Sequence, residues 1–224
     1  MNPSMLACSP GGSESINADH AAHWPIIGGH IYVVCDGIGH NSETAEAVNK
    51  FCSLFQCFSQ RSPIKDESTL HQAIIESVRI LENECGRGVS FCMTAALTLE
   101  EYVVVAHCGD CRLGYLTTTG INWKTLDDVP YYHMLRNGTI SHELYLKCRH
   151  LVACKIKLGE PQDNIKTFTL SRPEQGCLLL CSDGFWSEME SELNDTADVC
   201  RDNIGRKLSY LTKHAHDNFS VIIV

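Results

Sequence analysis

The sequence predicts an α+β fold, with β-sheet at its centre and helices packed outside. Two observations support this. Short runs of apolar and β-branched residues, each bounded by Gly, Asp or Asn, recur along the chain, and two segments with helical spacing of apolar residues separate the first run from the second. The clearest expected strands are residues 31–35, 91–99, 102–107, 112–117, 165–170, 177–181 and 219–224.

The two expected helices run from about Ser42 to Ser59 and from about Glu67 to Glu84. Asn41 or Ser42 can cap the first helix, and Pro63 lies in the connection between them. A third helix is expected over about 196–214.

Two turns are also expected. Residues 94–99 and 102–106 are separated only by Glu100-Glu101, which predicts a hairpin, and a second turn is predicted at residues 117–120. These short connections favour antiparallel pairing of neighbouring strands.

A chain of 224 residues is long enough for one large domain, so we expect a single domain over residues 1–224. The aromatic, irregular stretch from 127 to 159 is the exception to the strand pattern. It predicts either a partly helical, flap-like excursion near a functional site or a plain surface insertion.

The composition predicts a soluble, cytoplasmic protein. Hydrophobic residues make up 44% of the chain and charged residues 20%, and no window approaches the roughly 18 apolar residues of a membrane helix. The first residues lack the pattern of a secretory signal. A net charge of −9 disfavours nucleic acid and anionic membranes as partners.

The chain has thirteen cysteines. Many lie in apolar strand-like runs, where a thiol behaves as a small hydrophobe, so we expect them buried and reduced. Cys108 and Cys111 form a lone CxxC without the second ligand pair that zinc needs. Because Cys35, Cys108, Cys111 and Cys181 flank the aspartates described next, redox regulation is an alternative.

Four aspartates lie at the ends of expected strands. Asp36 and Asp183 each follow an apolar run and precede a glycine, Asp110 follows another run, and Asp217 opens the last one. A carboxylate at the end of a buried strand is costly unless something compensates its charge. Shared Mg²⁺ or Mn²⁺, which prefer oxygen ligands, would compensate all four at once. The alternative is that the Asp-Gly pairs only form turns.

At these residues the chain resembles the protein phosphatase 2C (PPM) family, and in particular its small stand-alone bacterial members. The matching segments, in order along the chain, are Asn17-Ala18-Asp19, Asp36-Gly37-Ile38-Gly39, Gly109-Asp110-Cys111-Arg112, Cys181-Ser182-Asp183-Gly184 and Asp217-Asn218-Phe219-Ser220. The resemblance implies a central β-sandwich of two antiparallel sheets flanked by helices, in α-β-β-α layers. It also implies hydrolysis of phosphoserine and phosphothreonine by a metal-activated water.

The resemblance also implies a role for each matching residue. Asp36 would bridge two Mn²⁺ or Mg²⁺ ions, and the Gly37 carbonyl would bind one of them. Asp183 and Asp217 would hold the other ion, so that Asp36, Asp183 and Asp217 carry the catalysis through metal-bound water. Asp19 would act through a coordinated water, and Asp110 would help hold a third, weaker ion. The implied partners are a phosphorylated protein and a Ser/Thr kinase or its target.

The chain departs from the family pattern at several positions. The phosphate-binding arginine expected a few residues before Asn17 is absent from Gly12–Ile16, and Ala18 replaces a Glu or Gln. Arg112 would either substitute for that arginine or have a structural role. Losing a bidentate arginine weakens phosphate binding, so we expect modest affinity for small phosphate esters. A pseudophosphatase of the same fold, acting as a regulatory or binding module, is the alternative function.

Several histidines are further candidates. His40 replaces a family glycine and would either donate a proton to the leaving group or cap the following helix. His214 and His216 precede Asp217 and are expected either beside the metal ligands or in solvent. His20 and His23 are expected to be ordinary loop residues.

Overall fold

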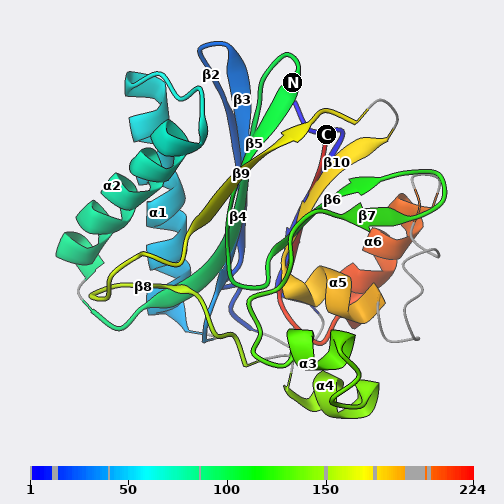
Figure 1. Cartoon of the computed structure of the whole chain (residues 1–224). Coiled ribbons are helices and arrows are strands. Elements are labelled where there is room, and N and C mark those ends of the chain that lie inside the picture. Colours follow the sequence, from blue (N-terminus) through cyan, green and yellow to red (C-terminus); the bar gives the residue numbers. More distant parts are fainter. Residues whose placement is uncertain are drawn as a thin grey trace.

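The computed structural model describes residues 2–11, 15–39, 41–85, 87–148, 151–173, 176–189, 200 and 203–224. It confirms the α+β prediction and the two antiparallel sheets. The sheets pack face to face, and Figure 1 shows helices on both outer sides of this sandwich. A cluster of buried residues that includes Tyr32, Val105, Leu113 and Ile222 fills the space between the sheets.

The first sheet has six strands, and its main path runs β2-β3-β4-β5-β9, with β8 paired to β4. The strands are β2 (His20–Ile26), β3 (Gly29–Gly37), β4 (Ser90–Thr98), β5 (Tyr102–Cys108), β8 (Ile156–Lys157) and β9 (Lys166–Ser171). The predicted hairpin is confirmed, because β4 and β5 pair with Thr98 opposite Val103. Every residue of β4 is buried, since helices cover one face of this sheet and the second sheet covers the other.

The second sheet has five strands in the order β1-β11-β10-β6-β7. The strands are β1 (Met5–Ser9), β6 (Arg112–Leu116), β7 (Ile121–Trp123), β10 (Cys177–Cys181) and β11 (Phe219–Ile223). The first and last strands of the chain are therefore neighbours, with Met5 opposite Ile223. This pairing brings the Asn17–Asp19 region close to the Asp217 region.

Helices α1 (Ser42–Arg61) and α2 (Glu67–Cys85) cover the six-stranded sheet, as predicted. The Asn41 side chain caps α1 by accepting a hydrogen bond from the Thr44 backbone N–H at 2.9 Å. Phe51 and Phe55 of α1 are fully buried, and Phe51 packs on Phe91 of β4 with ring centroids 5.0 Å apart. Burial of these rings fixes the helix layer on the sheet.

Helices α5 (Asp183–Met189) and α6 (Ile204–His214) lie against the five-stranded sheet. The third predicted helix is confirmed from residue 204 onward, whereas 196–199 and 201–202 lie outside the described residues. The 127–159 excursion is partly helical, with α3 (Tyr132–Arg136) and α4 (His142–Cys148) below the sandwich in Figure 1.

One prediction is wrong: His20 and His23 are not loop residues. Both lie in β2, which pairs along its length with β3. The segment lacks a clear apolar alternation and contains Pro25, so its sequence does not predict a strand. Proline is tolerated here because β2 is an edge strand of its sheet. Strands β1, β7 and β8 were also not predicted, because they are short or flanked by polar residues.

All thirteen cysteines are free thiols, and Cys35, Cys92, Cys177 and Cys181 are buried in their strands, as predicted. No described helix combines the length and the apolar character that crossing a bilayer requires.

Candidate metal centre

The strand ends that carry the aspartates meet at one edge of the sandwich. Strands β10 and β11 are antiparallel, with Cys181 opposite Val221, so the end of β10 and the start of β11 lie together. Asp183 opens α5 directly after β10, and Asp217 precedes β11. Asp36 lies at the same edge, because the groups acting on its carboxyl include Asp183, Asp19 and Asp110. This edge is the lower one in Figure 1, where α5 begins.

The glycines beside the aspartates allow these segments to touch backbone to backbone. A Cβ on Gly184 would lie 2.0 Å from the Asn218 carbonyl oxygen, and one on Gly37 would lie 2.7 Å from the Ala18 carbonyl oxygen. A Cβ on Gly109 would lie 2.4 Å from the Cys92 sulfur. Only Gly109 of the three has a positive φ, at 104°. Turn geometry therefore does not account for Gly37 and Gly184, which are needed for close packing of the segments.

Asn218 and Ser182 hold the amino-terminal segment in place. The Asn218 side chain accepts a hydrogen bond from the Ala18 N–H at 2.8 Å and donates one to the Pro10 carbonyl at 3.1 Å. The Ser182 hydroxyl donates to Asp19 at 2.6 Å and accepts from the Ser220 N–H at 2.9 Å. Neither residue was assigned a role from the sequence, although both stand inside the segments that carried the family resemblance.

The carboxyl groups of this edge strongly disfavour one another's ionisation. Burial raises the pKa of Asp36 well above its usual range, and the charges of Asp183, Asp19 and Asp110 raise it further. The Asp183 carboxyl is within hydrogen-bonding reach of Asp36. Burial and then the Asp183 charge raise the pKa of Asp19 to about 7, against the lowering effect of the Ser182 hydrogen bond. Burial raises the pKa of Asp110 to about 8, again with help from Asp183.

The donors at this edge fit hard divalent cations. Among the residues that the structure describes, one carboxylate oxygen of Asp110 is buried and has no hydrogen-bond partner. Within the described residues, no three His, Cys, Asp or Glu side chains are grouped to enclose a metal by themselves. Carboxylate and carbonyl oxygens are the ligands that Mg²⁺ and Mn²⁺ prefer, so the oxygen donors of this edge fit those ions.

Arg112 has a structural role and does not replace the missing phosphate arginine. Its guanidinium makes two hydrogen bonds to the Asp127 carboxylate, at 2.8 and 2.5 Å, and both side chains are buried. It also stacks on Trp186, 3.6 Å from the ring centroid. The Trp186 indole donates to the Asp110 carbonyl at 2.9 Å. Arg112 therefore fixes the loop that carries Asp110 and is not directed at a substrate.

Two of the remaining candidates, His214 and His216, stay outside this cluster. His40 and residues 12–14 lie outside the described residues, so the proposed proton donor is not placed. His216 is exposed and bonds Glu188 at 2.9 Å, and His214 stacks on Tyr210 in α6. Both histidines face solvent, which was one of the two expectations.

The cysteines beside the aspartates are poor candidates for redox chemistry. Burial raises the pKa of Cys108 to about 12, and burial also raises the pKa values of Cys35 and Cys111 well above the usual range. A reactive cysteine needs an accessible thiolate, which these buried thiols do not provide. The structure therefore favours the packing role that the sequence predicted.

The known proteins that this chain resembles are serine/threonine phosphatases. No protein-family model matches the chain. The serine/threonine phosphatase stp of Listeria innocua is 28% identical over 166 residues, which are 70% of this chain and 66% of that protein, or just under two thirds of its length.

Solved structures of bacterial phosphatases share the fold. The serine/threonine phosphatase of S. agalactiae superposes with a TM-score of 0.80 at 16% identity, over 97% of this chain and 96% of that one. The catalytic domain of the serine/threonine protein phosphatase PstP, in complex with two manganese ions, gives 0.73 at 18% identity, over 98% and 95%.

Proposed function

We propose that this chain, which has the PPM phosphatase fold and is homologous to bacterial serine/threonine phosphatases, is itself a metal-dependent phosphatase that hydrolyses phosphoserine and phosphothreonine in proteins. One observation carries the proposal. Asp19, Asp36, Asp110 and Asp183 converge at one edge, where the dominant charges on their carboxyls are other carboxylates. Such a cluster is stable in its charged form only with cations bound.

Each carboxylate has a proposed position around the ions. Asp36 would bridge two ions, with the Gly37 carbonyl on one of them, because the carboxyls of Asp183, Asp19 and Asp110 all act on the Asp36 carboxyl. Asp183 and Asp217 would hold the second ion, since their segments touch at Gly184 and Asn218. Asp19 would act through a coordinated water, and Asp110 would help hold a third, weaker ion through its unpaired oxygen.

Two such ions supply a nucleophile at neutral pH and neutralise charge on the phosphoryl group. The chain's own part is to hold the carboxylates at fixed separations, and the contacts of Ser182, Asn218 and Trp186 do this. PstP binds two manganese ions in its crystal structure. We propose that this chain likewise binds two ions, either Mn²⁺ or Mg²⁺. The choice between these two metals and the binding of a third ion are finer parts of the proposal.

Ala18, one departure from the family pattern, has a structural account. Its side chain is 1% exposed, and the Ala18 backbone packs directly against Gly37 while donating to Asn218. A small residue therefore fits this position without disturbing Asp19. The missing arginine predicts weak binding of small phosphate esters, so affinity for a protein substrate would depend on contacts further from the phosphate.

The biological setting belongs to the proposal as well. The substrate would be a phosphorylated protein, and a Ser/Thr kinase or the target of that kinase would be a natural partner. Cytoplasmic localisation and the single-domain organisation over residues 1–224 stay predictions from the sequence.

The test is phosphate release from p-nitrophenyl phosphate and from a phosphothreonine peptide, with and without Mn²⁺ or Mg²⁺. We expect metal-dependent turnover that Asp183→Asn abolishes. Asp163→Asn, which removes the same charge from an exposed loop, should leave it unchanged. The pseudophosphatase alternative, motivated by the missing arginine, predicts no turnover by the native chain under any metal condition. Equal rates for the native chain and Asp183→Asn would contradict the proposed mechanism.

A further inference from the structure

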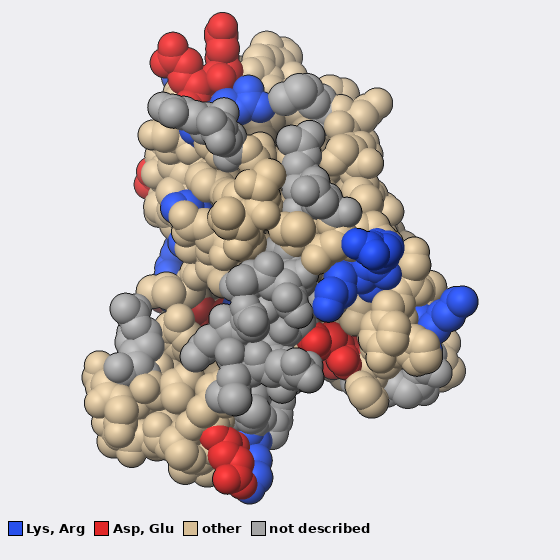
Figure 2. All heavy atoms as spheres, turned by 90° about the vertical axis from the view of Figure 1, so that its right-hand side faces the viewer, with Lys and Arg blue, Asp and Glu red and all other residues tan. Residues whose placement is uncertain are grey.

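Helix α6 carries basic side chains, whereas the protein as a whole is acidic. Between Ile204 and His214 it carries Arg206, Lys207 and Lys213 and no acidic residue, although the whole chain has a net charge of −9. Within the described residues, none of these three cations forms an ion pair. Figure 2 faces the side of the molecule that carries α6 and shows one group of Lys and Arg side chains there, with acidic side chains directly below it. Unpaired cations on an otherwise acidic surface favour an anionic ligand.

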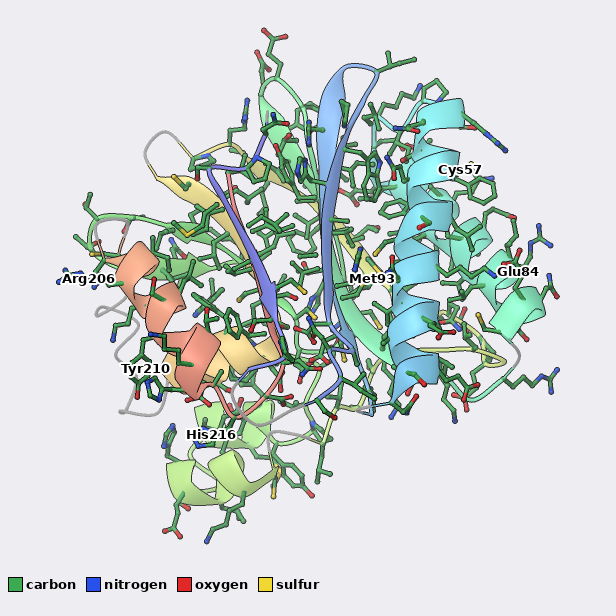
Figure 3. The ribbon with its side chains drawn as sticks, turned by 180° about the vertical axis from the view of Figure 1, so that it is seen from behind. Cys57, Glu84, Met93, Arg206, Tyr210 and His216 are labelled. Carbon is green, nitrogen blue, oxygen red and sulfur yellow. The ribbon has the colours of Figure 1, made fainter. Side chains whose placement is uncertain are left out.

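The same helix face is hollowed and carries an aromatic ring. A hollow of about 390 Å³ is lined by Asn203, Arg206, Lys207 and Tyr210, and we call it the α6 hollow. Tyr210 is 60% exposed, and its ring stacks on His214 with centroids 4.4 Å apart. The ring therefore lines the same hollow as the two cations Arg206 and Lys207. Figure 3 shows Arg206 and Tyr210 on α6, with His216 beyond the end of the helix.

The helix that lines the α6 hollow leads along the chain to the candidate metal centre. The helix ends at His214, and Asp217 follows three residues later. Arg206 and His214 are eight positions apart, which corresponds to about 12 Å along the helix axis. Arg206 is thus too far from Asp217 to contact the phosphate being hydrolysed. An extended peptide covers about 12 Å with roughly four residues, so one substrate chain can reach both places.

We propose that the α6 hollow binds an anionic side chain of the phosphoprotein substrate, located about four or more residues from the phosphoresidue at the metal centre. The anion is a Glu or Asp carboxylate or a second phosphate, and Arg206 and Lys207 pair with it while Tyr210 packs against the adjacent peptide. The inference rests on the proposed phosphatase function and specifies its substrate class. It also provides substrate affinity that the missing phosphate arginine does not.

The acidic stretch next to α6 in the sequence is a competing occupant. Glu190, Glu192, Asp195 and Asp198 precede α6 in the chain and lie outside the described residues. Occupation of the α6 hollow by this stretch is a different outcome from substrate docking, and the experiment separates the two.

The experiment compares Arg206→Gln/Lys207→Gln with Arg61→Gln/Lys65→Gln, a matched loss of two cations near the end of α1. Substrates are phosphothreonine peptides with Glu, a second phosphothreonine, or Gln four to six residues away on either side, together with p-nitrophenyl phosphate. We expect the first variant to raise KM for the Glu and doubly phosphorylated peptides about tenfold, with kcat unchanged. The Gln peptides and p-nitrophenyl phosphate should be unaffected, as should the control variant on every substrate.

A binding measurement keeps this proposal separate from the enzymatic one. Fluorescence anisotropy with the same labelled peptides in EDTA needs no turnover, and we expect about tenfold weaker binding of the acidic peptides to Arg206→Gln/Lys207→Gln. Selective binding without turnover by the native chain would support the α6 hollow and contradict the phosphatase function. Turnover without any preference for acidic peptides would support the phosphatase function and contradict the proposed role of the α6 hollow.

Two further results would overturn the inference. One is an equal loss in the Arg61→Gln/Lys65→Gln control, which would show a general charge effect. The other concerns the chain's own acidic stretch. If Glu190→Gln/Glu192→Gln/Asp195→Asn/Asp198→Asn tightened binding of the acidic peptides about tenfold, that stretch would be the occupant of the α6 hollow.

Discussion

Two groups of buried charge lie side by side at the lower edge of the sandwich, and they are compensated differently. Asp127 is paired with Arg112 through two hydrogen bonds, and Trp186 covers the guanidinium. Asp19 is buried and Asp36 is half-buried among other carboxyls, and the strongest charges acting on Asp36 are all negative. The buried arginine thus pairs with Asp127, whereas the charges that raise the pKa values of Asp36 and Asp19 are those of other carboxylates.

The difference indicates that the first group has a structural role and the second a functional one. A carboxylate paired with an internal cation stabilises one arrangement of the chain, as Asp127 does for the loop that carries Asp110. Carboxylates that repel one another reduce the stability of the metal-free protein and are retained only if an external cation binds them. Replacing a residue in each group should therefore have opposite consequences.

The largest effect is expected from Asp36→Asn. Loss of the bridging carboxylate should lower kcat/KM for a phosphothreonine peptide about 10³-fold, which is about 4 kcal/mol of transition-state stabilisation. The free energy of unfolding in EDTA should not fall, because the substitution removes repulsion with Asp183. Steady-state kinetics and urea unfolding of the same preparation check both parts. A variant that keeps native activity would show that Asp36 holds no essential ion.

Asp127→Asn should have the opposite effect. Breaking a buried ion pair leaves Arg112 uncompensated, so the free energy of unfolding should fall by roughly 3 kcal/mol in urea, with or without metal. Asp163→Asn, an exposed residue, serves as the control and should change stability by less than about 0.5 kcal/mol. Unchanged stability of Asp127→Asn would mean that the two groups of charge do not differ as described.

Gly184→Ala tests the close packing that places Asp183 beside Asp217. The added methyl group would lie 2.0 Å from the Asn218 carbonyl oxygen, so the segments must separate. We expect a loss of about 2 kcal/mol in stability and weaker Mn²⁺ binding by calorimetry. Gly205→Ala in α6 meets only Met5, at 3.9 Å, and should instead be neutral or slightly stabilising. Similar behaviour of the two variants would argue against a packing role for Gly184.

His30 is a third buried polar group, and burial favours its neutral form. His30 faces His23 with ring nitrogens 3.0 Å apart and stacks on Tyr32, and burial lowers the pKa of His30 to about 4. Because the unfolded chain binds this proton more readily, stability should fall as the pH drops from about 6.5 to 4. His30→Gln should reduce that fall by about 1 kcal/mol in pH-dependent urea unfolding, the smallest of these effects. His71→Gln is the control, and an equal change there would contradict this assignment.

Much of the fold could be predicted from the sequence, because the central strands and first two helices have strong apolar patterns. The predicted strand at 91–99 differs from β4 by one residue at each end. Strand β2 was missed since an edge strand exposed on one side can carry His, Ala and Pro without the alternation that marks a strand. The local sequence pattern therefore does not predict a strand whose structure is determined only by its pairing with a neighbouring strand.

The candidate site could be predicted only in part. The spacing of Asp36, Asp110 and Asp183 after apolar runs indicated that they share an edge, and the structure places them close enough to affect one another's ionisation. Turn propensity alone would have assigned Gly184 to a turn, whereas its role depends on Asn218, which is distant in the sequence. The α6 hollow could not be predicted, since its cations become a surface only when the helix is packed.

The most direct test of the account is a crystal structure of the native protein soaked in Mn²⁺, with anomalous diffraction measured at the manganese absorption edge. We expect two strong anomalous peaks between Asp36 and Asp183, one of them also next to Asp217. Saturated crystals without a peak at this edge of the sandwich, or with manganese bound only elsewhere, would contradict it.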